Sequence, residues 1–377
     1  MARLSPHRVI LKFWPGNNSG ADLEETHFMG EPISLVGHYP WRRLAVGLLA
    51  VLVVSVIAAG IGSVNIPPLT VIKMLVARLP LVDFESSWPE AWDTIVWQLR
   101  LPRILLASLV GGALAISGAA FQGLFRNPLA TPSLIGVSSG AGLGATVVLV
   151  TGVPLFFHGF SLLPIAAFAG GLTAVTAAYL IARQSEGLPL TSLILAGVAI
   201  AYLANAVASL LQIRSDPDLR PVLTWLLGGF ISAQWKHSLY LVPYLVPSVV
   251  VVLAYSRILN VLQLDEEHAQ QLGVNVERTK LVLMAAATLA TAAAVSFSGL
   301  IIFVGLVAPH VVRLVWGDDH RFLLPMAALV GAAFLILADL VARTIVSPSE
   351  LPVGIVTAFC GAPFFLYLLK RRRASSV

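Results

Sequence analysis

The sequence of 377 residues contains a single cysteine, Cys360, and few charged side chains. One cysteine excludes an intrachain disulfide framework and a cysteine-cluster metal site. Asp, Glu, Lys and Arg make up only 11% of the residues, whereas 57% are hydrophobic, and the mean hydropathy is +0.86. This composition excludes a soluble globular protein and indicates a multi-pass membrane protein. We expect Cys360, which lies in an apolar segment, to have a packing role.

A phosphate-binding loop is also missing, because the pattern G-x-x-x-x-G-K-[ST] does not occur. The histidines are scattered among few other ligand-type side chains, so the sequence predicts no metal site and no bound cofactor. The formal net charge of +5 would suit a nucleic-acid partner in a soluble domain. Here the basic residues gather at helix ends and in residues 370–373, which indicates membrane topology and no nucleic-acid partner.

The apolar stretches predict an all-α fold of about ten transmembrane helices. The seventh and eighth stretches are continuous. We divide them at residues 296–299, because about 36 residues of helix would exceed a hydrocarbon core roughly 30 Å thick. The expected spans are residues 44–62, 101–121, 135–152, 161–182, 190–212, 239–257, 280–297, 300–316, 322–345 and 351–369.

Residues 1–40 differ from the rest of the chain, because they are rich in Pro, Gly, Asn and acidic residues and contain no apolar run. This composition predicts a mobile cytoplasmic extension and not a signal peptide. The transmembrane domain then occupies residues 41–377. More Lys and Arg residues flank the spans on the side of the two termini than on the other side. We therefore expect both termini in the cytoplasm of a protein embedded in the lipid of the inner membrane.

Two arginines, Arg100 and Arg103, mark the start of the second span. Pro102 lies between them and is tolerated there, because a first-turn N–H has no intrahelical partner. The arginines can anchor the helix at the membrane surface or bind acidic groups of a partner protein. After a proline-broken loop, glycines recur every four residues at Gly136, Gly140 and Gly144, which predicts close packing against a neighbouring helix.

A second polar segment, residues 264–273, predicts a short helix between the sixth and seventh spans. Asp265 is expected to cap it and Gly273 to end it. A surface helix lying on the bilayer is one interpretation, but acidic residues suit an anionic cytoplasmic leaflet poorly, so we favour contact with a cytoplasmic protein. The apolar face consists of Leu264, Ala269 and Leu272, and the charged face of Glu266, Glu267, His268 and Gln270.

Several segments together resemble the FecCD-type permease subunits of ABC importers, which move iron-siderophores, haem or vitamin B12. The matching segments are LRLPR at 99–103, SGAAFQGLFRNPLATPSLIGVSSGAGLG at 117–144, LDEEHAQQLGV at 264–274, GLIIFVGLVAPHVVR at 299–313, ADLVAR at 338–343 and ELPVGIVTAFCGAPFF at 350–365.

The resemblance implies a homodimer of ten-helix permease domains, with two cytoplasmic ATPase subunits that use ATP and Mg²⁺. It also implies one substrate-binding protein, periplasmic or lipid-anchored, and a chain that hydrolyses nothing itself. The expected cargo is a ferric siderophore or related iron chelate, with haem and vitamin B12 as alternatives.

The resemblance also assigns residues. It implies that Arg100, Arg103 and Arg343 bind acidic residues of the substrate-binding protein, and that the helix at residues 264–273 transmits ATPase motion. Arginine suits docking because its planar charged fork pairs bidentately with carboxylates. For Arg343 a structural alternative is open, since Asp339 lies one helical turn before it.

The translocation path is expected to involve the fifth span, whose polar stripe consists of Asn205, Ser209 and Gln212. Hydrogen bonds between helices are the alternative role for such a stripe. A secondary carrier, as a different class of protein, would need membrane-embedded carboxylates, and Asp339 and Glu350 near one surface are poor candidates. A membrane receptor would carry a soluble domain, and the sequence contains none that we recognise.

Overall fold

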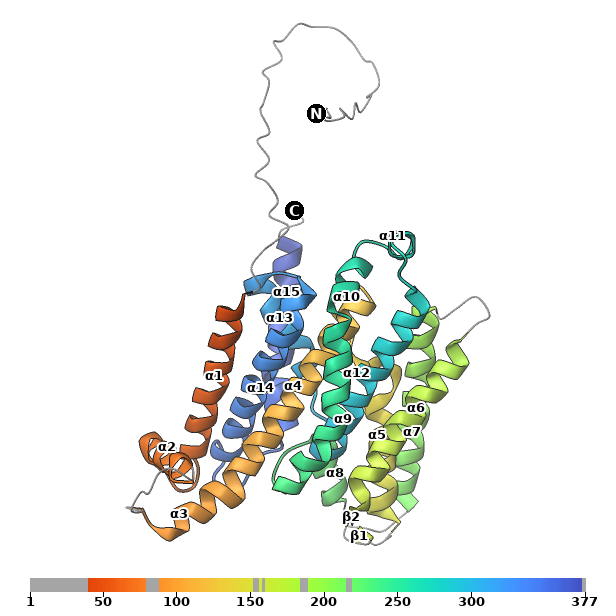
Figure 1. Ribbon diagram of the computed structural model, residues 1–377. Coiled ribbons are helices and arrows are strands. Elements are labelled where there is room, and N and C mark those ends of the chain that lie inside the picture. The colour runs from red at the N-terminus through yellow and green to blue at the C-terminus, as the bar shows by residue number, and fades with distance from the viewer. Residues whose placement is uncertain are drawn as a thin grey trace, which may run out of the picture. The chain divides into compact units, whose positions relative to one another are not determined.

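The computed structural model describes residues 40–78, 88–151, 156–157, 160–183, 189–214 and 219–374. The described residues belong to one compact unit that begins at Pro40. The extension expected at residues 1–40 lies, apart from Pro40, outside the described residues. Figure 1 shows a bundle of long helices with short helices at both ends.

Helices form nearly all of the regular structure. The bounds are α1 (Trp41–Gly60), α2 (Pro68–Val76), α3 (Glu90–Thr94), the π-helical turn η1 (Ile95–Arg100), α4 (Leu101–Leu124), the 3₁₀ turn η2 (Pro132–Ile135), α5 (Val137–Val150), α6 (Leu162–Ala182), α7 (Leu190–Arg214), α8 (Arg220–Leu227), α9 (Trp235–Ala254), α10 (Ser256–Leu262), α11 (Glu266–Gln271), α12 (Val276–Ser298), α13 (Val304–Trp316), α14 (His320–Thr344) and α15 (Val353–Ala374). Two short strands, β1 (Phe156–Phe157) and β2 (Phe160–Ser161), pair antiparallel.

The predicted all-α membrane fold is confirmed. Among the described residues, seven helices are long and apolar enough to cross a membrane. Shorter apolar helices at Val137–Val150, Val304–Trp316 and Val353–Leu368 occupy the three remaining expected spans. The predicted division of the long apolar run is also present, because α12 ends at Ser298 and α13 begins at Val304. Short helices α2, α3, α8 and α10 were not predicted.

The second span begins earlier than predicted. One continuous helix runs through α3, η1 and α4 from Glu90 to Leu124, so Pro102 does not lie at a free helix end. In η1 the N–H of Leu101 donates to the carbonyl oxygen of Val96, five residues back. Pro102 has no N–H and cannot take part in the regular α-helical hydrogen-bond pattern. The π-helical turn already departs from that pattern just before the proline, and the helix therefore continues through it.

Helices α4 and α14 pack together at the centre of the bundle through small residues. A Cβ atom at Gly111 would overlap the carbonyl oxygen of Gly331, and one at Gly331 would overlap Ala115. The two backbones therefore touch, which is how apolar helices gain packing energy inside a membrane.

Helices α5 and α6 approach in the same manner. Gly140 faces the carbonyl oxygen of Gly170, and Gly144 faces that of Ala166, with no room for a Cβ at either position. Gly136 differs from the expectation, because it precedes α5 and has φ +94°. Its role is a left-handed turn between η2 and α5, which favours glycine because other residues are strained at such angles.

The bundle has two distinct ends, and the candidate sites lie at them. Figure 1 shows α11 and the C-terminal end of α15 at one end, which we call the α11 end. Helices α2 and α3 lie at the opposite end, which we call the α3 end.

Candidate functional site

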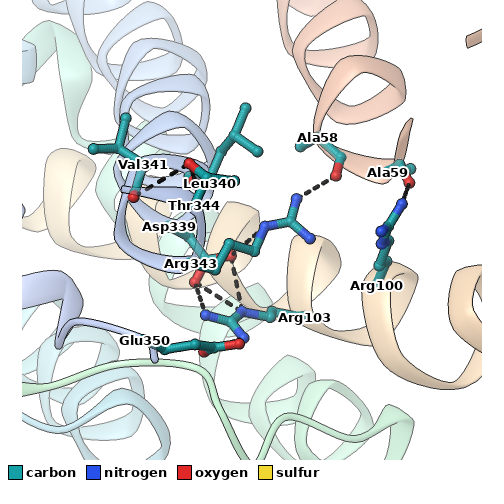
Figure 2. A network of polar contacts seen from close by, with 10 residues as sticks. All are labelled: Ala58, Ala59, Arg100, Arg103, Asp339, Leu340, Val341, Arg343, Thr344 and Glu350. Atoms are coloured by element: carbon teal, nitrogen blue, oxygen red, sulfur yellow. Dashed lines mark hydrogen bonds and ion pairs between the residues drawn. The ribbon is translucent and has the colours of Figure 1, made fainter. Parts of the chain in front are cut away.

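Five charged residues gather at the α3 end, and we call them the arginine cluster. They are Arg100 from η1, Arg103 from α4, Asp339 and Arg343 from α14, and Glu350 from the segment before α15. Figure 2 shows Arg103 between the two carboxylates and Arg100 and Arg343 directed at the end of α1. The cluster thus brings the three arginines of the docking prediction together.

Arg103 is the centre of the arginine cluster. Its Nε donates to both carboxylate oxygens of Asp339 at 2.9 Å, and its Nη2 lies 2.8 Å from Oδ1. Its Nη1 donates to Oε2 of Glu350 at 2.8 Å. The Asp339 side chain is 2% exposed and that of Glu350 is 32% exposed. Arg103 therefore joins α4 to α14 through a buried ion pair and holds a second carboxylate at the surface.

Arg100 and Arg343 bind backbone oxygens at the end of α1. Arg100 donates from Nη1 to Ala59 at 2.6 Å and to Gly60 at 3.1 Å, and Arg343 donates from Nη2 to Ala58. The last carbonyl groups of a helix have no intrahelical donor and carry partial negative charge. Both arginines therefore satisfy these carbonyl groups and fix α1 against η1 and α14.

The structure adds partners that sequence reasoning missed. Arg100 and Arg103, three positions apart, reach different partners. The structural alternative for Arg343 is present as a contact, because its Nε lies 3.9 Å from Oδ2 of Asp339, one turn earlier. No local sequence pattern could predict the pairing of Arg103 with Glu350, because the two residues are 247 positions apart. Docking of a partner by these arginines stays a prediction.

At the α11 end, the short helix α11 forms as predicted. Oδ1 of Asp265 accepts a hydrogen bond from the N–H of Glu266 at 2.6 Å, and Gly273, with φ +82°, follows the last turn. The expected apolar face is divided, however. Ala269 is fully buried against the rest of the chain, whereas Leu264 is 70% and Leu272 66% exposed. The two leucines therefore form an apolar surface without Ala269.

Two cations bind Glu266, and they attach α11 to the bundle. Nζ of Lys280, on α12, donates to Oε2 of Glu266 at 2.8 Å. Nη2 of Arg126, just after α4, lies 3.4 Å from Oε1. The side chain of Lys280 is only 7% exposed. We call α11 with Arg126 and Lys280 the α11 cluster. Sequence reasoning placed Glu266 on the charged face of this helix and missed both cations.

The predicted path residues lie on an outward face of this single chain. Asn205 and Ser209 are exposed on α7, and Gln212 is partly buried. Their role in transport stays a prediction. Cys360 on α15 is exposed and not packed within the chain, contrary to expectation. Near it, α8, the loop before α13 and α15 line an open cavity of about 550 Å³ whose walls are apolar, including Leu227, Ile302 and Phe359.

The chain matches the FecCD transport family over residues 48–371. It belongs to this family. One FecCD relative is the cobalamin import system permease BtuC of Halobacterium salinarum, 49% identical over 77% of each chain. Another is the hemin transport permease HmuU of Yersinia pestis, 41% identical over 88% of this chain and 96% of the relative. The Fe(3+)-citrate import permease YfmE of Bacillus subtilis is 37% identical over 87% and 95%.

A solved structure has the same fold. It is an inward-facing conformation of an ABC transporter assigned to the metal-chelate type, with a TM-score of 0.76 and 34% identity. The match covers 88% of this chain and all of that one. The FecCD chain is therefore a multi-pass permease of an ABC importer, which is a transport subunit and not a catalytic one.

Proposed function

We propose that a homodimer of this chain moves a ferric siderophore or a related iron chelate into the cytoplasm by ATP-driven alternating access. The observation that carries this proposal is the FecCD match across residues 48–371, together with relatives named for cobalamin, hemin and Fe(3+)-citrate import. All three cargoes are organic chelates of a metal ion. The membrane is the inner membrane, with the α11 end facing the cytoplasm.

Two ATPase subunits bind at the α11 end in this proposal and supply ATP and Mg²⁺ chemistry that the chain does not have. The exposed Leu264 and Leu272 support this role, because large apolar side chains at a surface indicate an interaction site. Asp265, Glu266, Glu267 and Gly273 complete the coupling segment with the buried Ala269. The attachment of Glu266 to Lys280 and Arg126 gives motion of α11 a direct connection to α12 and α4.

One substrate-binding protein docks at the α3 end. The arginine cluster contains three guanidinium groups and two carboxylates, so one positive charge in it is compensated by backbone carbonyl groups alone. A protein surface that presents carboxylates is complementary to this excess, which favours fast and oriented association.

The cargo passes between the two copies along surfaces without charge. The apolar cavity beside Phe359 and the neutral stripe of Asn205, Ser209 and Gln212 support this assignment, because a bulky chelate must move on without being held by strong ion pairs. Cobalamin is a second candidate cargo, since a relative named for cobalamin import is 49% identical.

Uptake into proteoliposomes tests the function and the cargo together. The chain would be reconstituted with the ATPase and substrate-binding protein of the same importer, and uptake of a ferric siderophore, haemin and cyanocobalamin compared. We expect ATP-dependent uptake of one cargo and none without ATP or without the binding protein. Uptake driven by a proton or sodium gradient in the absence of ATP would contradict the proposal and indicate a secondary carrier.

A further inference from the structure

A small cavity opens between the three arginines at the α3 end. Its volume is about 190 Å³, and its polar walls include Arg100, Arg103, Arg343 and Glu350. This volume suits one acidic side chain. Every charged group on its wall is an arginine except Glu350, so the chain already places one of its own carboxylates where an external carboxylate would bind.

The partners of the arginines differ in how easily they can be replaced. Arg100 and Arg343 donate to backbone carbonyl oxygens at the end of α1, and Arg100 also donates to that of Val64 in the segment after it. These backbone groups cannot leave without moving the chain. Asp339, on α14, is 2% exposed and pairs with both Arg103 and Arg343. Among the described residues, Glu350 is the one partner that is a partly exposed side chain on a non-helical segment.

The hydrogen bonds of Arg103 also indicate Glu350 as the replaceable partner. Its Nε and Nη2 are directed at Asp339, and its Nη1 is held by Glu350 alone. Because Nη2 is buried, a carboxylate arriving from outside can form a charge-assisted bond with Arg103 only at Nη1. Glu350 occupies one of the two N–H groups of that atom, so an arriving carboxylate competes with it there.

We propose that Glu350 is an internal competitor, which occupies Arg103 until an acidic side chain of the substrate-binding protein displaces it. The proposal rests on the proposed docking function and adds a residue to it. Glu350 lowers the affinity of docking, and its release loosens the segment that leads into α15. That segment is held at its other end by hydrogen bonds from the N–H of Leu351 to Ala342 and from the N–H of Val353 to Gly228. Docking therefore changes the contacts at the start of α15, and this helix lines the apolar cavity.

The test measures binding of the substrate-binding protein to the complete transporter in nanodiscs. Glu350→Gln keeps the shape of the side chain and removes its charge. We expect affinity to rise about threefold to fivefold, which is the scale of a partly exposed ion pair. Glu90→Gln is the matched control, because Glu90 is an exposed carboxylate on α3 at the same end. It makes the same change in net charge and should leave affinity within about twofold.

A third variant separates this inference from the docking proposal. Arg100→Gln should weaken binding, since Arg100 contributes the charge that only carbonyl groups compensate. Unchanged affinity in folded Arg100→Gln complexes would overturn docking at this cluster. If Arg100→Gln weakens binding while Glu350→Gln leaves it unchanged or weaker, docking stands and the competitor role of Glu350 is wrong. A rise of equal size in Glu90→Gln would also overturn it, because the effect would then be general electrostatic attraction.

Discussion

The arginine cluster and the α11 cluster both contain ion pairs, but they differ in how deeply the acidic partner is buried. In the arginine cluster the central pair, Arg103 with Asp339, is buried and joins residues 236 positions apart. In the α11 cluster the acidic partner, Glu266, is 34% exposed, and large leucines face outward beside it. The first cluster therefore fixes helices of the bundle to one another, and the second holds a small helix whose large leucines stay exposed.

The burial of an ion pair determines how much it contributes to the free energy of unfolding. Removing one member of a buried ion pair leaves an uncompensated charge in a medium that solvates it poorly, which typically costs about 3–5 kcal/mol. An exposed pair contributes about 0–1 kcal/mol, because water and salt replace the lost partner. Mutations in the two clusters should therefore differ in which property they damage, folding at the α3 end and coupling at the α11 end.

The largest loss of stability is expected for Asp339→Asn. The neutral side chain leaves Arg103 and Arg343 without their buried counter-charge, at an expected cost of about 3–5 kcal/mol. Thermal unfolding in detergent and the yield of folded protein would measure it. Asp318→Asn is the control, since this aspartate also binds an arginine, Arg313, but is 70% exposed. If both variants unfold at the same temperature, the contrast between buried and exposed pairs does not hold.

An intermediate effect is expected for Lys280→Glu. The change brings a second carboxylate next to Glu266 and removes a charge-assisted hydrogen bond. Because Lys280 is only 7% exposed, this bond contributes more than a fully exposed pair, about 1.5–3 kcal/mol. Stimulation of ATP hydrolysis by the substrate-binding protein should fall, because α11 loses its bond to α12. Lys280→Arg keeps the positive charge beside Glu266 and should retain most of the stimulation. Equal loss of stimulation in Lys280→Arg and Lys280→Glu, in complexes that assemble normally, would refute this role of the pair.

The smallest effect on folding is expected for Glu267→Arg combined with Leu272→Asp. Both side chains are exposed on or beside α11, so the stability of the isolated chain should change by no more than about 0.5 kcal/mol. Copurification of the ATPase subunit and transport should nevertheless be lost. Ala269→Asp provides the contrast, because Ala269 is fully buried and its replacement should destabilise the chain. Normal assembly and uptake by the double variant would show that α11 is not the ATPase contact.

The membrane spans and α11 could be predicted from the sequence, because the patterns that indicate them involve residues close together in the chain. Long apolar runs predict membrane helices, and a capping Asp265 with Gly273 after it marks a short helix. The partners of the arginines could not be predicted in this way, because Glu350 and Asp339 meet Arg103 only after α4 and α14 have packed. The early start of the second span was missed for a different reason, since Pro102 is read as a helix boundary unless a π-helical turn accommodates it.

The unbroken helix from Glu90 to Leu124 has a mechanical consequence. Its 35 residues rise roughly 50 Å at about 1.5 Å per residue, and shortening it would break backbone hydrogen bonds along its length. Arg103 lies in the part of this helix nearer the α3 end, and Arg126 just beyond its other end contacts α11. A displacement at either membrane surface therefore cannot be absorbed along this helix and must reappear as tilt or rotation. We expect this helix to pivot at its close backbone contacts, which are Gly118 with Gly305 on α13 and Gly111 with Gly331 on α14.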